Sequence, residues 1–300
     1  MENLIITYSG EPVRIDKYIT GELSDVSRTQ VQMMINNEFI LVNDEAVKSN
    51  YILRENDEIS IEFVAPVETD IEPENIALDI YYEDSDIIVV NKPEGMVVHP
   101  APGNYKGTLV NALLYHCKDL SGINGEIRAG IVHRIDKDTS GLLVSCKNDI
   151  SHRHLSQQFH DKKVNRRYIA ICSGVIPHNL GKINAPIGRH PVNRQQMTVR
   201  ENGKHAITNF KVLDRFKNHT LVELSLETGR THQIRVHMKY IGFPVTGDPI
   251  YGNKGEISQF GQFLHAKTLG FIHPTTKKYV EFESPLPDYF DKFIKSLKDE

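Results

Sequence analysis

Residues 131–145 read IVHRIDKDTSGLLVS, two aliphatic runs separated by a charged interval. Each aliphatic run has the length and side-chain types of a buried strand. In the interval, Asp136 lies between Arg134 and Lys137, and Thr139 opens a TSG sequence that suits a tight polar turn. The stretch therefore predicts a carboxylate and several cations at the point where two core strands approach each other.

The composition is typical of a globular protein with a substantial core. The chain has 300 residues, 39% hydrophobic and 25% charged, which is enough for one large domain and one small domain. No apolar run approaches the ~18 residues of a membrane helix, and the N-terminus lacks the pattern of a signal peptide. Cys117, Cys146 and Cys172 are too far apart for a CxxC site, which favours reduced, buried thiols. We therefore expect a cytoplasmic protein with no membrane partner.

Charge is unevenly distributed along the chain. The overall net charge is −4, yet residues 1–70 carry −9, residues 71–130 carry −5 and residues 131–250 carry +10. A concentrated positive segment is the pattern expected of a protein that binds a polyanion. The alternative is an uneven scatter of solvated charges.

Turn and helix signals divide the chain into two folded parts. Ser27 and Gln30 form a capping box that starts a helix, and FILVN and ILRENDEISIEF are typical of strands joined by tight turns. An acidic stretch with two prolines and little periodicity follows, which indicates a linker. We expect a small module over residues 1–63, a linker over 64–78 and a larger domain over 79–300.

The larger domain is predicted to mix strands and helices. Strands are expected over the hairpin IYYEDSDIIVV and over GIVHR, GLLVSCK, RRYIAICSG and HTLVELSLETG. A helix should begin after Thr108, and another should cover HRHLSQQFHDKK. A third should cover THQIRVHMKYIG, with Thr231 as its N-cap and Gly242 as its stop.

Asp136 is the strongest candidate for chemistry. An aspartate in such a loop is commonly a turn residue, but a turn has no need of His133 and Arg134 directly upstream. A carboxylate kept ionised at a partly dehydrated site needs a permanent cation nearby, because burial opposes the charged form. Arg134 and Arg230 are candidates. Arg230 precedes a helix at a strand-to-helix corner, from which its guanidinium could bind a carboxylate in a fork, unless it only extends a solvated basic face.

Tyr168 follows Arg166 and Arg167 at the start of a strand. Such a tyrosine can simply pack in the core, but next to basic residues it also suits a platform on which a nucleobase stacks. The chain contains fourteen histidines, so we considered a metal site. None forms an HExxH motif, and the spacing of His232 and His237 does not align two rings on one helix face, so we expect no metal site.

Several of these stretches resemble the motifs of a known family. HRIDKDTSGLLV is similar to the HRLDxxTSGLLV signature of the RluA/RluD family of RNA pseudouridine synthases. RRYIAI and TGRTHQIRVHM resemble the tyrosine and arginine motifs of this family, and NKPEGMVVHP and LHAKTLGFIHP its flanking motifs, so the similarity covers about residues 79 to 287. Residues 12–61 resemble the small RNA-binding module first recognised in ribosomal protein S4, without its usual basic character.

The resemblance implies an α+β fold, with a small N-terminal α/β RNA-binding module and a catalytic domain built on a mixed, mainly antiparallel β-sheet flanked by helices. It implies that Asp136 is the catalytic aspartate, Tyr168 the stacking tyrosine and Arg230 the ion-pair partner of Asp136, and that Arg134 helps to displace the target base. The same motifs supply the other expected substrate-binding residues, which are His133, Thr139, Asn91, Lys92, His99, Arg166, Arg167, His232, Gln233, Arg235 and Leu264.

The resemblance also implies a reaction and a partner. A protein without metal or organic cofactor would isomerise uridine to pseudouridine in structured RNA, with large-subunit ribosomal RNA as the expected substrate and transfer RNA as the alternative. Apart from the resemblance, a monomer is the default expectation. Asp136 would either attack the sugar at its anomeric carbon or take a proton from the neighbouring carbon. Two other functions compete. A glycoside hydrolase needs two carboxyl groups flanking the bond, and a non-catalytic RNA-binding protein would have no use for the motif residues.

Overall fold

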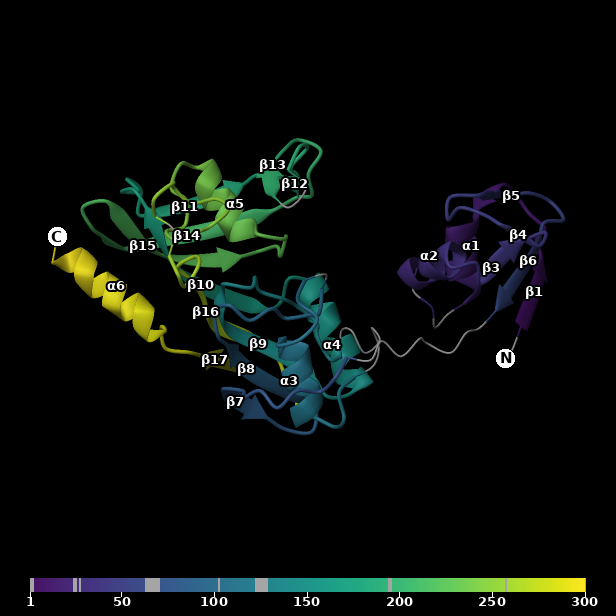
Figure 1. The fold of residues 1–300 in the computed structure, drawn as a ribbon, viewed down its shortest axis with the longest axis horizontal. Helices are drawn as coiled ribbons and strands as arrows, with labels where there is room; N and C mark the ends of the chain where they lie inside the picture. The colour runs from purple at the N-terminus through teal and green to yellow at the C-terminus, as the bar shows by residue number, and fades with distance from the viewer. Residues whose placement is uncertain are drawn as a thin grey trace. The chain divides into compact units, whose positions relative to one another are not determined.

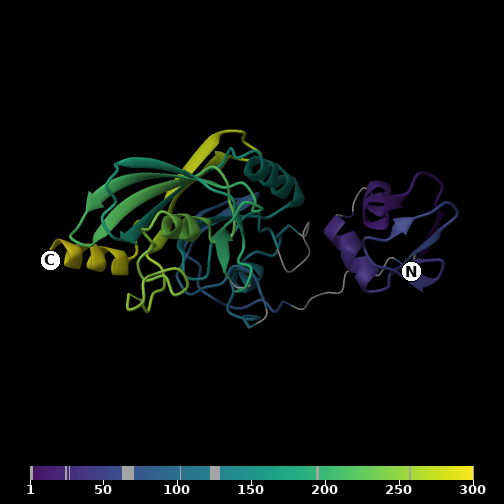
Figure 2. The same ribbon diagram turned by 90° about the horizontal axis from the view of Figure 1, so that it is seen from above.

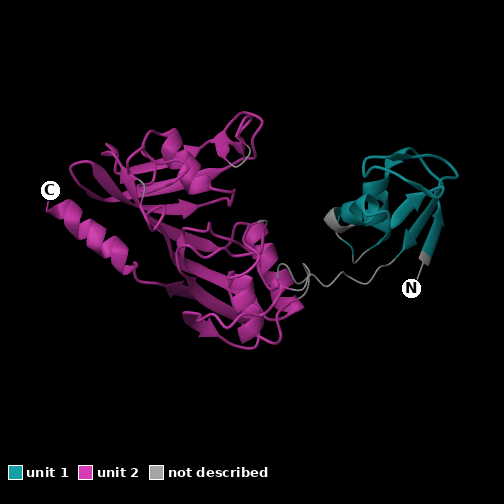
Figure 3. Ribbon diagram, in the orientation of Figure 1, with its two compact units in different colours: residues 1–68 teal, residues 69–300 magenta. Residues whose placement is uncertain are grey.

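The chain is described by a computed structural model that covers residues 3–23, 26, 28–62, 71–101, 103–121, 129–193, 196–256 and 258–299. It divides into two compact units, residues 1–68 and residues 69–300, shown in different colours in Figure 3. Among the described helices, none has the length and apolarity needed to cross a bilayer.

The smaller unit combines two helices with short antiparallel strands. Its elements are β1 (Asn3–Thr7), β2 (Val13–Arg14), α1 (Ile15–Glu22), α2 (Arg28–Asn36), β3 (Ile40–Val42), β4 (Glu45–Ala46), β5 (Ile52–Leu53) and β6 (Glu58–Glu62). The sheet order is β1-β6-β3-β4, and β2 pairs with β5. Aliphatic residues from both helices and from the strands form one core. The predicted helix and strands are therefore present, while Ser27 of the predicted capping box lies outside the described residues.

The larger unit is built on a nine-stranded sheet in the order β11-β14-β15-β10-β16-β9-β8-β7, with β17 paired to β16. These strands are β7 (Ile80–Glu83), β8 (Ile87–Lys92), β9 (Ser140–Cys146), β10 (Asn165–Ser173), β11 (Leu180–Asn184), β14 (Ile207–Arg215), β15 (His219–Leu226), β16 (Leu264–Ile272) and β17 (Tyr279–Glu283). The pairs are antiparallel except for β9 with β16. The predicted mixed, mainly antiparallel sheet is confirmed. A separate hairpin joins β12 (Ile187–Arg189) to β13 (Met197–Val199).

Helices cover both faces of this sheet, as Figures 1 and 2 show. They are α3 (Leu109–His116), α4 (Asp149–His160), α5 (Gln233–Tyr240) and α6 (Asp288–Lys298). Alternate residues of the central strands share one core with α3 and α5. The residues between them contact α4 or α6 on the other face. Because both faces are buried, β8, β9 and β10 have continuous apolar runs.

Two predicted elements differ from the structure. GIVHR is not a strand: after Gly130, only Ile131 makes an isolated bridge, to Ser145, and the following residues form an irregular loop. Thr231 is not the N-cap of α5, because His232 occupies that position in a left-handed conformation with φ of 55°. Thr108, in contrast, caps α3 with a reciprocal capping box, as predicted.

The stretch predicted as a linker falls partly outside the described residues, since residues 63–70 are not described. Residues 71–78 have no helix or strand but pack on the larger unit. Glu72 accepts a hydrogen bond from the Asn111 side chain through its carbonyl, and Ile71 and Leu78 contact the core. This part of the predicted linker is held by the sheet domain, because Ile71 and Leu78 pack on its apolar core.

The TSG sequence does not form the expected turn, which lies at residues 137–138; Gly141 is the second residue of β9 and allows this strand to run parallel to β16. Its φ is 119°, and a Cβ at this position would lie 2.4 Å from the carbonyl oxygen of Ala266 and 2.5 Å from its nitrogen. Such distances are too short for any side chain, so only glycine lets the two backbones approach. This pairing brings the loop that carries Asp136 to the end of a core strand.

We predict that Gly141→Ala lowers the free energy of unfolding of the larger unit by more than about 3 kcal/mol, since a backbone clash adds to an unfavourable φ. Gly242→Ala is the matched control, because Gly242 also has a positive φ (89°) but no atom within 4 Å of the added Cβ. It should cost only about 1 kcal/mol. Urea denaturation measures both, and equal losses would contradict the proposed steric requirement.

Candidate active site

A cavity of about 630 Å³ opens beside the loop that carries Asp136. Its wall is formed by this loop, by the start of β10 and by the segment from the end of β15 into α5. The Asp136 backbone turns sharply, with the Thr139 N–H donating to the Asp136 carbonyl at 3.1 Å. The Asp136 side chain is 20% exposed, so its carboxylate faces the cavity and can meet a ligand.

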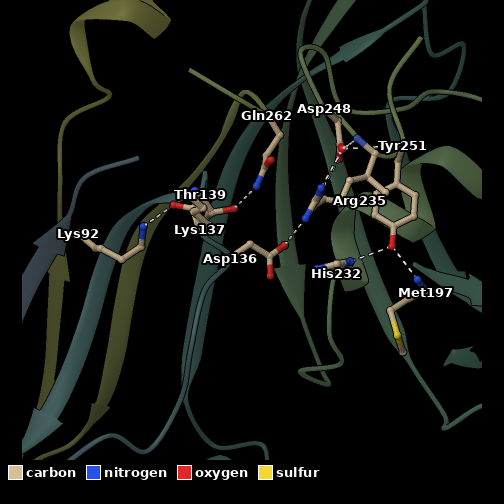
Figure 4. A network of polar contacts seen from close by, with 11 residues as sticks. Lys92, Asp136, Lys137, Thr139, Met197, His232, Arg235, Asp248, Tyr251 and Gln262 are labelled. Atoms are coloured by element: carbon tan, nitrogen blue, oxygen red, sulfur yellow. Dashed lines mark hydrogen bonds and ion pairs between the residues drawn. The ribbon is translucent and has the colours of Figure 1, made fainter. Parts of the chain in front are cut away.

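Arg235 of α5 holds the Asp136 carboxylate. Its Nη1 donates to Asp136 Oδ2 at 2.9 Å, as Figure 4 shows. Our prediction that Arg230 is the ion-pair partner was wrong. Arg230 lies on the cavity wall, but its Nε donates to the carbonyl of His205 at 3.0 Å. The reason is geometric: the backbone turns at Arg230, before the helix begins, whereas Arg235 lies in the first turn of the helix and reaches inward.

Arg235 is itself buried, with only 4% of its side chain exposed, between two carboxylates. Nε and Nη2 donate to the two oxygens of Asp248 at 2.7 and 2.9 Å. Burial disfavours the charged guanidinium, but the carboxylates of Asp248 and Asp136 outweigh burial and raise the pKa of Arg235. Burial likewise opposes the charge on Asp248, and the Arg235 fork lowers its pKa below the ordinary value. The site therefore contains a permanent cation shared by two acids.

Tyr168 lies on the same side of β10 as the core residues Ala170 and Cys172, facing α5. It is 6% exposed and lines the cavity with Asp136. Burial raises the pKa of Tyr168, so the phenol is neutral at physiological pH. The ring thus supplies a flat apolar surface within the same cavity as the carboxylate, which suits stacking of a planar ligand.

In addition to Arg235, four cations line the cavity, and each of them is at least partly exposed: Arg134, Lys162, Arg166 and Arg230. Within the described part of the chain, none of them forms an ion pair. Arg166 packs over the Phe159 ring at 5.5 Å, and its buried Nε has no hydrogen-bond partner in the described residues. Uncompensated cations at a cavity opening attract a polyanion.

Two predicted substrate-binding residues support the Asp136 loop from behind. His133 accepts a hydrogen bond at Nε2 from the Val144 N–H at 3.1 Å and stacks on Phe159. Burial lowers the pKa of His133 to about 3, with a smaller contribution from Arg166, so the ring is neutral. Thr139 is 2% exposed and accepts at Oγ1 from Gln262.

Lys92 also supports this loop, although it does not line the cavity. It is 1% exposed, and its Nζ donates to the carbonyls of Pro93, Met96 and Lys137 at 2.6 to 2.9 Å. Burial lowers the pKa of Lys92 to about 7. The last of these bonds ties β8 to the residue directly after Asp136 (Figure 4).

The structure separates the predicted site residues into two groups. Those that line the cavity are Asp136, Tyr168, Arg230, Arg134, His133, Thr139, Arg166, His232, Gln233, Arg235 and Leu264. Asn91, Lys92, His99 and Arg167 lie outside its lining. Asn91 donates to Asp79, and Arg167 forms ion pairs with Glu281 and Glu283. These two side chains are therefore engaged in contacts elsewhere on the sheet.

Gln233 has little capacity left for a ligand. Its Oε1 accepts from the Thr228 hydroxyl and from the Arg230 N–H, and its Nε2 donates to the Ile207 carbonyl and the Thr208 hydroxyl. These four hydrogen bonds fix the corner before α5. Gln233 thus orients the cavity wall rather than offering a polar group to the cavity.

Sequence reasoning missed Asp248 and Tyr251. The Tyr251 ring packs against the Arg235 guanidinium at 5.0 Å, and its Oη contacts His232 Nδ1 and the Met197 N–H, each at 2.8 Å. The segment QIRVHM pointed toward such a residue only if it is buried, as the structure shows. An arginine in a buried helix needs carboxylates near it to compensate its charge. The sequence could not indicate that one of them follows thirteen residues later.

Among the residues that the structure describes, two groups of possible metal ligands lie away from the cavity. One contains Glu83, His116 and Cys117, and the other Asp84, Asp86 and His273. In the second group Asp84 accepts from two backbone N–H groups and from His273, so these ligand atoms already have protein partners. In the first group Lys147 lies 3.0 Å from Glu83 and would compete with a cation.

The comparisons with known proteins all indicate the same family. A family model described as RNA pseudouridylate synthase matches residues 86–240, and one described as S4 domain matches residues 13–59. An uncharacterized RNA pseudouridine synthase YlyB from Bacillus subtilis is 55% identical, covering 99% of both chains. A ribosomal large subunit pseudouridine synthase D from Zymomonas mobilis is 44% identical over 95% of this chain and 93% of its own. The solved structure of human RNA pseudouridylate synthase domain containing 1 is 27% identical, with a TM-score of 0.60 over 76% of this chain and 97% of its own.

The neutral state of His133 predicts a pH dependence of stability. The unfolded chain takes up a proton on this histidine near pH 6.5, whereas the folded protein does so only near pH 3. Stability from this residue is therefore complete above pH 6.5 and is lost as the pH falls toward 3. The free energy of unfolding should fall more steeply in the wild type than in His133→Gln, by up to about 1.4 kcal/mol per pH unit. Urea denaturation between pH 7 and 4 measures the free energies of unfolding. If those of the wild type and of His133→Gln fell in parallel with pH, a buried neutral His133 ring would be ruled out.

Proposed function

The chain belongs to the RNA pseudouridine synthase family, and from this premise we propose that its cavity converts uridines of large-subunit ribosomal RNA into pseudouridine. The observation that carries the proposal is the Asp136–Arg235 pair, which presents a partly exposed carboxylate to the same cavity as the Tyr168 ring. We expect the chain to act as a monomer in the cytoplasm.

The reaction requires little beyond this arrangement. The bond between uracil N1 and the sugar must break, the base must rotate while it is held, and a bond must form from carbon 5 to the same sugar carbon. Carbon 5 then loses its proton and N1 takes one up, so the product is an isomer of the substrate. Asp136 either attacks the anomeric carbon or takes a proton from the neighbouring carbon. On both routes positive charge develops on the sugar, and an ionised carboxylate stabilises it. Arg235 orients this carboxylate through the hydrogen bond of 2.9 Å from its Nη1.

A uridine stacked in an RNA helix cannot reach Asp136, so the base must leave the stack. The cavity volume of about 630 Å³ lies within the range of pockets that enclose small ligands. We propose that Tyr168 stacks on the flipped uracil and that the exposed Arg134, at the opening, occupies the space that the base leaves. The enclosed cavity would hold the detached base while it rotates.

The four cations of the cavity lining, which form no ion pair with any residue that the structure describes, supply the contacts to phosphates. Arg134, Lys162, Arg166 and Arg230 all lie in the segment that carries a net charge of +10. RNA binding should therefore weaken with salt. Relatives named for the large ribosomal subunit, at 44 and 45% identity, support ribosomal RNA as the substrate; transfer RNA is the alternative.

Competing functions have weaker support from the cavity. A glycoside hydrolase needs a second carboxyl group flanking the scissile bond. The other carboxylate in the cavity lining is Glu227. It binds Lys182 at 2.9 Å and Asn209 at 3.0 Å, so it is not presented as a general acid. A purely RNA-binding protein would require the cations but not the buried ion pair beneath Asp136.

The catalytic role of Asp136 predicts that Asp136→Asn abolishes isomerisation and leaves RNA binding within about threefold of the wild type. The assay is tritium release from large-subunit ribosomal RNA labelled at carbon 5 of uridine, since the new bond replaces that hydrogen. Tritium release from transfer RNA transcripts, labelled in the same way, tests the alternative substrate. Asp138→Asn is the matched control, because Asp138 lies in the same loop but not in the cavity lining; it should keep near-wild-type turnover.

Release of tritium by Asp136→Asn would remove Asp136 from its assigned role. If the wild type bound these RNAs but released no tritium from either of them, the non-catalytic function would be favoured. If the wild type released tritium from transfer RNA alone, the proposed reaction would stand and transfer RNA would take the place of ribosomal RNA as its substrate.

The ion pair predicts that the loss of two arginines has different effects on turnover and on RNA binding. Arg235→Gln should lower turnover on saturating RNA, because Asp136 loses the hydrogen bond of 2.9 Å that orients its carboxylate. Arg230→Gln should weaken RNA binding and leave turnover on saturating RNA close to that of the wild type. Near-ultraviolet circular dichroism checks folding, since removal of Arg235 leaves Asp248 buried without its partner. A loss of turnover on saturating RNA in Arg230→Gln alone would restore Arg230 as the partner.

A further inference from the structure

The imidazole of His232 lies on the wall of the cavity, on a strained part of the backbone. His232 lines the cavity together with Asp136 and Tyr168. As the N-cap of α5, it has a left-handed conformation with φ of 55°. This conformation is unfavourable for a residue with a side chain, and such residues cluster at functional sites. The strain therefore marks His232 as a candidate for a role in the reaction.

One nitrogen of this ring is bound inside the protein. Nδ1 lies 2.8 Å from the Oη of Tyr251, and in Figure 4 the ring lies between Asp136 and Tyr251. Nε2 forms no hydrogen bond with any residue that the structure describes. The second nitrogen of His232 is therefore available to a ligand in the cavity.

The phenol of Tyr251 decides which of the two nitrogens carries the hydrogen. Tyr251 is only 3% exposed and burial raises its pKa, so its O–H keeps its proton and needs an acceptor inside the protein. Oη already accepts a hydrogen bond from the Met197 N–H at 2.8 Å. Among the described residues, the acceptor within reach of this O–H is Nδ1 of His232. The hydrogen of the imidazole is therefore on Nε2.

The His232 ring is also neutral. Burial lowers the pKa of His232, the charges of Arg235 and Arg134 act in the same direction, and the opposite effect of Asp136 does not outweigh them. A neutral imidazole with a fixed N–H offers a hydrogen bond without adding a further positive charge beside Arg235. The cavity thus contains a donor that suits a neutral or anionic planar ligand.

We propose that His232 is a catalytic residue of the isomerisation, whose Nε2–H donates to a carbonyl oxygen of uracil and stabilises the base while it is detached. Tyr251 is then a positioning residue, because it sets the tautomer of His232. The inference rests on the proposed function of the cavity and adds the group that binds the leaving base.

Bond cleavage creates the charge that this donor stabilises. When the bond between N1 and carbon 1′ breaks, its electron pair stays on the base, and uracil detaches as an anion with its charge shared among N1, O2 and O4. Carbon 1′ bonds to Asp136, or carbon 2′ gives Asp136 a proton, which balances the charge on the sugar. A hydrogen bond to O2 or O4 is stronger in the anion than in the nucleoside, so the donor at His232 lowers the barrier.

The same donor serves the base before and after it rotates. Half a turn about the line through N3 and carbon 6 exchanges N1 with carbon 5, and it also exchanges O2 with O4. A single N–H in a fixed place therefore meets a carbonyl oxygen in both orientations. The electron pair then forms the bond from carbon 5 to carbon 1′, and Asp136 either leaves carbon 1′ or returns the proton to carbon 2′. His232 keeps its hydrogen throughout.

The first test removes the donor and then restores it. His232→Leu should lower turnover on saturating RNA on the order of 100-fold, as is common when one donor to a developing negative charge is lost, with RNA affinity within about threefold of the wild type. His232→Gln should recover on the order of tenfold of this loss, because its side-chain amide again offers an N–H. Tritium release from large-subunit ribosomal RNA labelled at carbon 5 of uridine measures turnover.

His237→Gln is the matched control. His237 is a buried histidine of the same helix that contacts Thr208 and the carbonyl of Ala185, each at 2.9 Å, and it does not line the cavity. Thermal melting gives the folded fraction, and turnover per folded molecule should stay near that of the wild type. Wild-type turnover in folded His232→Leu would overturn the proposal. A loss in His232→Gln or in His237→Gln as large as that in His232→Leu would overturn it too.

The second test reads the tautomer directly. With histidine isotope-labelled in its ring nitrogens, the pair of resonances that disappears in His232→Gln belongs to His232, and protonated and unprotonated nitrogens have well-separated chemical shifts. We expect Nε2 to be protonated and Nδ1 unprotonated in the wild type. Tyr251→Phe keeps the ring beside Arg235 but lacks the O–H, so the two tautomers should mix and turnover should fall less than in His232→Leu.

The outcome separates this proposal from the proposed function. A hydrogen on Nδ1 of His232 in a wild type that releases tritium would overturn the proposal and leave the proposed function in place, even if His232→Leu does not fold. A wild type that releases no tritium from either RNA would overturn the proposed function, and this proposal with it.

Discussion

The buried guanidinium of Arg235, neutralised by Asp248 and shared with Asp136, is the interaction on which the site depends. A positive charge in a protein interior is tolerated only where carboxylates surround it. Asp248 meets that condition from a turn of the main chain, which leaves one nitrogen of the guanidinium for the cavity. Asp136 is thus held by a permanent cation in the same cavity as the aromatic ring of Tyr168.

The fold brings these groups together by placing a loop at the end of a doubly buried strand. β9 pairs antiparallel with β8 and parallel with β16, and the close approach at Gly141 allows the second pairing. The loop before β9 is held from behind by Lys92, whose Nζ binds three carbonyls. With the sheet fixed on one side and α5 on the other, Asp136 has little freedom to move away from Arg235. The rigidity of the sheet is therefore part of the chemistry of the site.

Local patterns in the sequence were enough to predict the elements with strong signals, and they failed where tertiary contacts decide. The apolar runs of β8, β9 and β10 and the cap at Thr108 could be read directly. GIVHR has strand-like residues but forms no strand: Gly130 and Ile131 meet β9 at Cys146 and Ser145, and the residues after Ile131 continue as a loop. Arg230 and Arg235 look alike in the sequence, and only the helix start at Gln233 decides which of them points inward. Asp248 could not be predicted, since its pairing with Arg235 depends on the fold of a separate turn.

The most direct measurement is a structure of the protein bound to ribosomal RNA that carries 5-fluorouridine at a modified position. Fluorine at carbon 5 blocks loss of the hydrogen that normally completes the reaction, so the altered nucleotide should remain in the cavity. The account predicts a flipped nucleotide stacked on Tyr168, with its sugar carbon 1′ or 2′ in contact with the Asp136 carboxylate and Arg235 still bound to Asp248. A nucleotide that stays stacked in the RNA helix, or a sugar held remote from Asp136, would contradict it.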